Sequence, residues 1–174
     1  MELNAFRAAQ APLRDQYTKD AQAACITLKA SGEAGSSSVT CKVDTGRGFA
    51  LAGIHPKAGG SGAELCAGDM LLEALVACAG VSLTAAATML DVPLKSAHVT
   101  AEGDVDLRGT LGISPDTPVG FKEIRLSFDV ETDAPRETRA ELLALVERYC
   151  VVFQTIRNSP ATAVKLNVRS PAKV

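Results

Sequence analysis

The fold of this chain depends on one apolar stretch, Asp69–Leu90, which reads DMLLEALVACAGVSLTAAATML. Its last seventeen residues, 74–90, carry no charge and approach the length of a membrane span, which needs about 20 apolar residues. Charged residues crowd its start and seven of the seventeen are Ala or Gly, so we expect a buried core helix instead. Asp69 is the expected N-cap and Glu73 is expected in the first turn. Asp91-Val-Pro93 should end the helix near Leu90.

Segments of strict alternation on either side of this helix predict half-buried antiparallel strands. The strands predicted by alternation are Ala24–Ala30, Val39–Val43, Ala97–Leu107, Ile124–Val130 and Val164–Val168. An apolar strand, Phe49–Ile54, is predicted after the turn Asp44–Gly48. The predicted connections include a turn over Gly32–Ser37 and a long loop over His55–Gly68. The first twenty residues read as a short helix or an N-terminal arm.

A second helix is predicted to begin at Asp133 and Pro135. Its apolar stripe comprises Leu142, Leu143, Val146, Tyr149 and Cys150, at spacings typical of one helix face. The element order βββ-α-ββ-α-β predicts one α+β domain over residues 1–174, with antiparallel sheets packed on two helices.

The composition excludes several classes of protein. Eighteen basic residues against 20 acidic ones give a net charge of −2, and there are only seven aromatic residues and no Trp. Neither a nucleic-acid surface nor an anionic membrane surface is expected from this balance. Five cysteines in 174 residues do not make a disulfide scaffold, and the start of the chain does not resemble a signal peptide. We therefore expect a cytoplasmic protein with reduced thiols.

Most common catalytic motifs are absent from this sequence. The two histidines, His55 and His98, have no metal-ligand neighbours in sequence, and we expect a turn residue and an exposed strand residue respectively. There is no Cys-x-x-Cys, no nucleotide-binding glycine fingerprint and no nucleophile elbow. The sequence therefore predicts neither a metal site nor a bound cofactor.

Cysteine is the remaining candidate chemistry. Cys25 has no assigned role, Cys41 is expected in the core, and Cys66 is expected in a loop without an activating partner. Cys78 and Cys150 both face the predicted core from a helix. Two helices packed on one sheet could bring these sulfurs together, although free cysteines often only fill space in a core. On the residue pattern alone, a structural role for both stays open.

The two motifs Gly68-Asp-Met-Leu-Leu-Glu73-Ala-Leu-Val-Ala-Cys78-Ala-Gly80 and Glu147-Arg-Tyr-Cys150-Val-Val-Phe-Gln-Thr resemble the OsmC/Ohr family. This family comprises osmotically inducible and organic-hydroperoxide-resistance proteins. The resemblance extends from about Ala23 to Val168 because the element order also agrees. It implies an intertwined homodimer of the OsmC/Ohr-like fold, with pockets at the subunit interface.

The resemblance further implies a thiol peroxidase without a cofactor. Cys78 would attack an organic hydroperoxide and become a sulfenic acid, and Cys150 would condense with it to form a Cys78–Cys150 disulfide. A dithiol, in some members a lipoylated protein, would then reduce the disulfide. An apolar pocket beside Cys78 would favour fatty or aryl hydroperoxides over hydrogen peroxide.

The sequence departs from the hydroperoxidase pattern in three places. Ohr-type members carry a glutamate where this chain has Gly68, and a proline where it has Val151. They also carry an arginine in the turn after the first strand, whereas residues 32–35 contain none. The arginines that could replace it in space are Arg14, Arg47, Arg148 and Arg157. These departures indicate an OsmC-like branch, and the alternative function is a non-catalytic protein that binds a small ligand or senses thiol oxidation.

Overall fold

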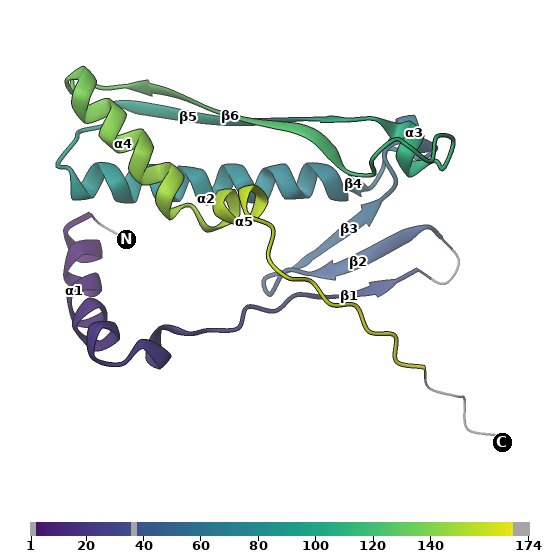
Figure 1. Ribbon diagram of the computed structural model, residues 1–174, viewed down its shortest axis with the longest axis horizontal. Helices are drawn as coiled ribbons and strands as arrows, with labels where there is room; N and C mark the ends of the chain where they lie inside the picture. The colour runs from purple at the N-terminus through teal and green to yellow at the C-terminus, as the bar shows by residue number, and fades with distance from the viewer. Residues whose placement is uncertain (1–2, 36–37, 169–174) are drawn as a thin grey trace.

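The computed structural model describes residues 3–35 and 38–168 and has an α+β architecture (Figure 1). One long helix, α2 (Ala67–Met89), runs through the molecule. Strands β5 (Ser96–Val105) and β6 (Phe121–Glu131) lie along one side of α2, and a four-stranded sheet lies on the opposite side. The predicted mixture of sheets packed with helices is confirmed.

The four-stranded sheet has the order β1 (Ser31–Ala34), β2 (Thr40–Asp44), β3 (Phe49–Gly53) and β4 (Leu65–Cys66). The first three strands are antiparallel, as predicted, but β4 pairs parallel to β3. The turn between β2 and β3 contains Gly46 at φ 76°, a backbone conformation that suits glycine. The Gly46 N–H donates to Oδ1 of Asp44 at 2.8 Å and closes that turn.

The strand predicted over Ala24–Ala30 is wrong. After the short 3-10 helix η1 (Ala21–Ala24), this segment is extended and exposed, and Ile26 and Leu28 keep 77% and 82% of their surface accessible. The first strand is instead β1, inside the segment predicted as a turn; Ser36 and Ser37 lie outside the described residues. Alternation cannot show which segment finds a hydrogen-bonding partner, and here β1 pairs with β2.

Helix α2 begins three residues earlier than predicted. Cys66 is its N-cap and makes no side-chain capping bond, so Asp69 lies in the first turn and Glu73 in the second. The predicted N-cap role of Asp69 is wrong because the pairing of β4 with β3 fixes the point where the helix starts. The predicted end is confirmed, since the last helical residue is Met89.

Strands β5 and β6 form an antiparallel ribbon whose inner face packs on α2. The ribbon is joined by a loop that contains the short helix α3 (Leu107–Thr110). The predicted alternation is confirmed at its centre, where Ala101 pairs with Leu126 and both pack toward Leu75 and Ala79 of α2. This face forms one of the two hydrophobic clusters of the described chain.

Two consecutive helices, α4 (Arg136–Tyr149) and α5 (Val151–Arg157), follow the ribbon. The predicted apolar stripe was too wide, because Leu143 and Tyr149 are 45% and 55% exposed. The buried stripe of α4 is Leu142, Val146 and Cys150. Helix α5 was not predicted, and it changes the surroundings of Cys150.

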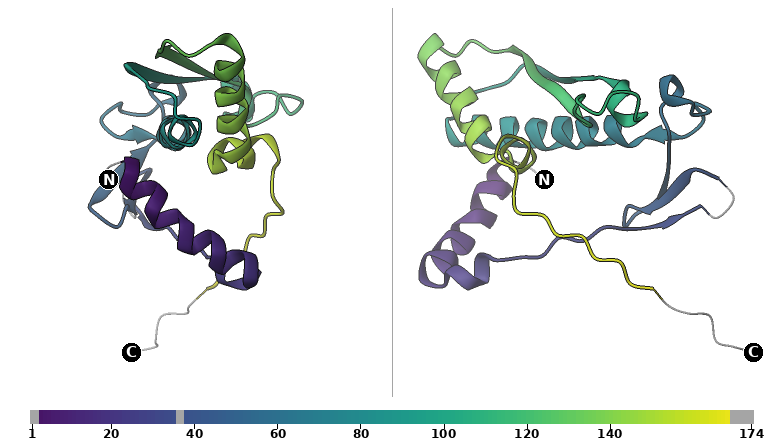
Figure 2. Two further views of the ribbon diagram at one scale, coloured as in Figure 1. Left: turned by 90° about the vertical axis from the view of Figure 1, so that its left-hand side faces the viewer. Right: turned by 45° about the vertical axis from the view of Figure 1, so that its right-hand side comes forward.

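The two ends of the described chain extend away from this core (Figure 2). The N-terminal segment forms a helix, α1 (Leu3–Lys19). For residues 1–20 we predicted either a short helix or an arm, and the structure has a helix; residues 1–2 lie outside the described part. The strand predicted over Val164–Val168 is wrong, because residues 161–168 are extended and exposed and pair with no strand in the described chain. Val164 is fully exposed, because no sheet in the described chain covers the apolar face of this alternating segment.

Only one face of helix α2 is buried in the core. Leu75, Ala79, Leu83 and three later residues are buried, as expected for a core helix, while Val81 is 72% exposed. By length and composition alone α2 could cross a membrane, and 28% of its most apolar 18-residue window is buried. The left view of Figure 2 looks nearly along α2, with the β5–β6 ribbon above it, α4 beside it and α1 below it.

Candidate active site

Cys78 lies in the middle of α2, at the edge of the helix face that packs on the ribbon. Its neighbours on that face, Leu75 and Ala79, are 1% and 0% exposed. The Cys78 side chain packs against this cluster but is itself only half-buried. Its position therefore keeps the thiol in contact with the core and still open to an approaching molecule.

Cys150 occupies the junction between α4 and α5. Its N–H donates to the carbonyl oxygen of Val146 at 3.0 Å, and its own carbonyl accepts from the N–H of Gln154 at 2.9 Å. Its extended backbone, with φ −73° and ψ 105°, turns the chain from one helix into the next. The side chain is fully buried because it continues the Leu142–Val146 stripe toward α2.

The structure brings the two predicted thiols together, and their surroundings favour the thiolate of Cys78. Burial by itself raises the pKa of the Cys78 thiol. The opposing hydrogen bonds come, in order of weight, from the Val152 backbone N–H, the Cys150 thiol, the Val151 backbone N–H and the Ser82 hydroxyl. Together these donors hold the pKa of Cys78 below its ordinary value, which is the direction expected of a reactive cysteine.

The pKa of Cys150 is displaced in the opposite direction. Burial raises the pKa of Cys150, and the nearby Cys78 raises it further, since two neighbouring thiols do not both ionise readily. Hydrogen bonds from the Phe153 backbone N–H and the Ser82 hydroxyl only partly offset this. The pair is therefore asymmetric, and Cys78 ionises first while Cys150 keeps its proton. All five cysteines are free thiols in this structure.

Sequence reasoning missed most of the donors around Cys78. Ser82 lies four residues after Cys78 on the same helix face, and this spacing was the available signal. The Val151 and Val152 N–H groups belong to the first turn of α5, where helical N–H groups have no partner within the helix. Since α5 was not predicted, neither was its contribution to the site.

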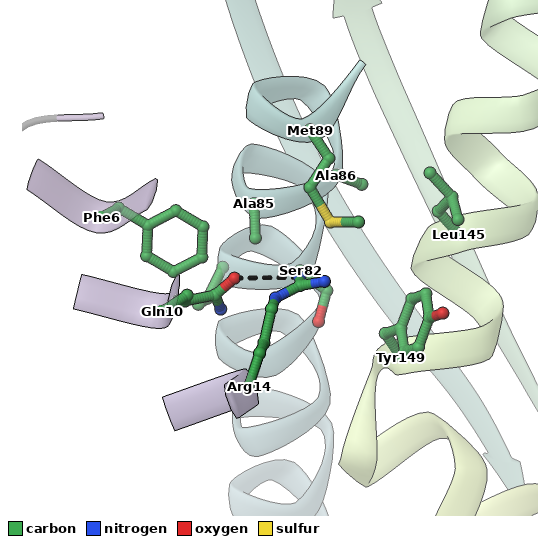
Figure 3. Close-up of a pocket in the computed structure, with 10 residues that line it drawn as sticks. Phe6, Gln10, Arg14, Ser82, Ala85, Ala86, Met89, Leu145 and Tyr149 are labelled. Carbon is green, nitrogen blue, oxygen red and sulfur yellow. Dashed lines mark hydrogen bonds between the residues drawn. The ribbon is translucent and has the colours of Figure 1, made fainter. Parts of the chain in front are cut away.

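A pocket of about 550 Å³ adjoins Ser82 and lies between α1, α2 and α4 (Figure 3). Its lining is mainly apolar and comprises Phe6, Gln10, Arg14, Val81, Ser82, Ala85, Ala86, Met89, Leu145 and Tyr149. Neither sulfur lines it, so Ser82 is the link between the pocket and the thiol pair. The volume is within the range of small-molecule sites, roughly 300–1,000 Å³.

The structure distinguishes the four candidate arginines. Arg14 lines the pocket, and its Nη2 donates to Oε1 of Gln10 at 3.2 Å. Arg157 pairs with Glu147 at 3.7 Å. The remaining two lie elsewhere, Arg148 beside its own neighbour Tyr149 and Arg47 in the turn between β2 and β3. Only Arg14 therefore joins Ser82 in one pocket.

The other candidates occupy ordinary positions. His55 is the N-cap of the short helix η2 (Pro56–Ala58), where its Nδ1 accepts from the Lys57 N–H at 3.1 Å, and His98 is exposed on β5. Cys25 is exposed and Cys66 is half-buried. Cys41 is half-buried on β2, so its expected core position is only partly confirmed. Among residues 3–35 and 38–168, no group of three or more potential metal ligands gathers.

Comparison with known structures supports the fold. The OsmC-like protein from Mycoplasma pneumoniae matches with a TM-score of 0.65 and 14% identity, over 77% of this chain and 89% of that one. An organic hydroperoxide resistance protein OsmC from Legionella pneumophila matches with a TM-score of 0.56 and 16% identity, over 77% and 93%. The organic hydroperoxide resistance protein OhrB of Bacillus subtilis matches with a TM-score of 0.53 and 19% identity, over 77% and 93%.

Sequence identities this low support a shared fold but do not support a shared activity. No curated protein sequence matches this chain. The family model described as OsmC-like protein matches residues 60–165, which include α2, the β5–β6 ribbon, α4, α5 and both cysteines of the site. The chain therefore belongs to the OsmC family.

Proposed function

We propose that this protein is a thiol-dependent peroxidase that reduces organic hydroperoxides, with Cys78 as the attacking thiol and Cys150 as the resolving thiol. The observation that carries the proposal is the asymmetric pair. Two cysteines 72 residues apart in sequence lie close enough for each thiol to shift the pKa of the other, and the pKa of Cys78 is lowered while that of Cys150 is raised. A merely space-filling pair has no need of the backbone and hydroxyl donors that surround Cys78.

In the proposed reaction, the Cys78 thiolate attacks the outer oxygen of ROOH, and the O–O bond breaks. Cys78 becomes a sulfenic acid, and the departing alkoxide takes up a proton to form the alcohol ROH. The Cys150 thiol then attacks the sulfenic sulfur, which releases water and forms the Cys78–Cys150 disulfide. An external dithiol, such as a lipoylated protein, is oxidised as it restores both thiols by exchange.

The half-buried position of Cys78 suits this sequence of steps. The peroxide reaches the sulfur of Cys78 from outside. The fully buried Cys150 lies on the core side of Cys78, and its reaction with the sulfenic acid prevents a second oxidation. The apolar pocket next to Ser82 supports a preference for alkyl or aryl hydroperoxides over hydrogen peroxide.

Exposed apolar surface supports the homodimer that the family resemblance implies. Phe49 and Leu51 on β3 are 69% and 48% exposed, and Val81 on α2 is 72% exposed. The extended segments around Leu28 and Leu166 add alternating apolar side chains that no strand of the described chain covers. Apolar surface of this extent favours burial against another chain.

A second candidate function is binding of a small apolar ligand without catalysis. The pocket itself favours it, because its lining is mainly apolar and contains neither sulfur. In that case Cys78 would remain a free thiol when peroxide is added to folded protein.

A peroxide titration separates the two functions. Reduced protein receives one equivalent of cumene hydroperoxide or hydrogen peroxide, and the thiols are then located by peptide mass mapping. A Cys78–Cys150 disulfide within seconds, faster with the organic peroxide, is expected. Cys78→Ser should abolish the reaction, and Cys150→Ser should accumulate sulfenic or sulfinic acid at Cys78. Cys66→Ser is the matched control and should react like the parent protein. Free thiols after minutes would overturn the peroxidase proposal.

A further inference from the structure

We propose that Ser82 carries a proton in the second half of the reaction, from the Cys150 thiol to the hydroxide that leaves the sulfenic acid of Cys78. This role of Ser82 rests on the proposed peroxidase function and adds a third residue to the two cysteines. The observation behind it is the position of one hydroxyl beside both thiols, at the border of an otherwise apolar core.

Ser82 lies one helical turn after Cys78 on α2. Side chains four residues apart on a helix are neighbours, with Cβ atoms about 5–6 Å apart. Ala79 and Leu83 are both buried, so Ser82 borders the buried face of the helix, as Cys78 does. Figure 3 shows Ser82 on the part of α2 that lies between α1 and α4.

The buried stripe of α4 approaches α2 at two levels. Val146 belongs to the same cluster as Leu83, and Cys150 belongs to the cluster that contains Ala79. Ser82 lies between these two levels. Its hydroxyl hydrogen-bonds at both thiols and lowers the pKa of each. A hydroxyl can donate to one atom while it accepts from another, which is what a proton carrier requires.

The resolving step requires a proton to move. Burial and the nearby Cys78 raise the pKa of Cys150, so Cys150 is protonated at neutral pH, whereas only a thiolate is a good nucleophile. The leaving group is hydroxide, and it leaves more readily as water. One proton therefore has to leave Cys150 and reach the departing oxygen.

Other carriers for this proton are lacking in the part of the chain that the structure describes. The only group whose charge shifts the pKa of Cys150 is the other thiol of the pair. The adjacent Glu147 is exposed and pairs with Arg157 at 3.7 Å. Thr88 is the only buried polar residue described, and its hydroxyl donates to a backbone carbonyl of its own helix at 2.7 Å. Ser82 is therefore the side chain available for the transfer.

The step balances without any further reactant. The sulfur of Cys150 bonds to the sulfur of Cys78, and the S–O bond of the sulfenic acid breaks. Cys150 gives its proton to Oγ of Ser82, and Ser82 gives its own proton to the departing hydroxide. The products are the disulfide and one water molecule, and Ser82 is unchanged. Because the proton passes within the site, the rate of this step should change little with pH.

The test measures the resolving step by itself between about pH 6 and pH 9. Reduced protein is mixed with cumene hydroperoxide at two concentrations and quenched with acid at successive times. The sulfenic acid and the disulfide are then counted by mass mapping. Conversion of one into the other does not depend on the peroxide concentration, and this separates it from the first step.

Ser82→Ala should slow this conversion about 100-fold at the lowest pH, at the lower end of the range for a positioned proton-transfer group. Its rate should then rise about tenfold per pH unit, because the variant depends on the small thiolate fraction of Cys150. Ser82→Thr keeps the hydroxyl and should restore most of the rate. Thr84→Ala is the matched control, since the Thr84 hydroxyl donates to the carbonyl oxygen of Gly80 at 3.1 Å, and it should react like the parent protein.

A thiol exchange reaction separates proton transfer from simple placement of the thiols. With 5,5′-dithiobis(2-nitrobenzoate), Cys78 forms a mixed disulfide, and attack by Cys150 releases a stable thiolate that needs no proton. Ser82→Ala should therefore slow this release much less than it slows the loss of water. Equal slowing of the two reactions would overturn the proposal, because Ser82 would then only position the sulfurs.

Two other results would also overturn it, and they differ in what they leave standing. If Ser82→Ala forms the disulfide at the parent rate and with the parent pH profile, Ser82 carries no proton and the two-cysteine reaction stands. If the parent protein forms no disulfide with peroxide, the proposed function fails, and the role of Ser82 fails with it.

Discussion

Two adjacent leucines of α4 offer a direct test of how the core is built. Leu142 is 4% exposed and packs in the cluster with Leu83 and Val146, whereas Leu143 is 45% exposed. Leu→Ala at either position makes the same change at consecutive sites of one helix, so the difference in helix propensity largely cancels. What remains is the difference in burial.

The expected magnitudes follow from that burial. Leu→Ala removes three carbon groups, and at about 0.8 kcal/mol for each buried group the transfer loss at Leu142 is about 2.4 kcal/mol. The cavity left in the cluster raises the loss in unfolding free energy to about 3 kcal/mol. At Leu143 about half of the transfer loss applies and no closed cavity forms, so we expect about 1 kcal/mol.

Thermal unfolding followed by calorimetry and by circular dichroism measures the difference. For a chain of this size, 1 kcal/mol lowers Tm by about 2–4 °C, so Leu142→Ala should lose roughly 6–12 °C and Leu143→Ala roughly 2–4 °C. Urea titrations of the same proteins give the free energies independently. Equal losses at the two positions would refute the packing of α4 described above.

Two further predictions concern the site and the ribbon. Ser82→Ala removes a donor to the Cys78 thiolate, so the pKa of Cys78 should rise. The pH profile of Cys78 alkylation by iodoacetamide should then move to higher pH. An unchanged profile would exclude Ser82 as a donor. Gly103→Ala places a methyl group against Cε1 of Phe121, closer than two carbon atoms can approach, so the ring must move and Tm should fall. Gly48→Ala, with open space around it, should leave Tm nearly unchanged.

Much of this fold could be predicted from local pattern. The charge-free run of α2 and the alternation of β5 and β6 each reflect a periodicity that adjoining residues carry by themselves. The wrong predictions were strands, whose formation depends on hydrogen bonding to another strand. Ala24–Ala30 and Val164–Val168 alternate as well as any strand, but neither has a partner in the described chain. Alternation measures suitability for a sheet, and only the tertiary arrangement supplies the sheet.

The sequence by itself identified Cys78 and Cys150 as the candidate pair, because each lies on the apolar face of a helix and their motifs resemble one family. Only the tertiary structure decided how they differ. The pKa of Cys78 is lowered by N–H groups of a helix that was not predicted and by a hydroxyl four residues away, and Cys150 is buried by contact with α2. Hydrogen-bond partners and burial depend on segments distant in sequence, and a helix from the N-terminus completes the pocket for the same reason.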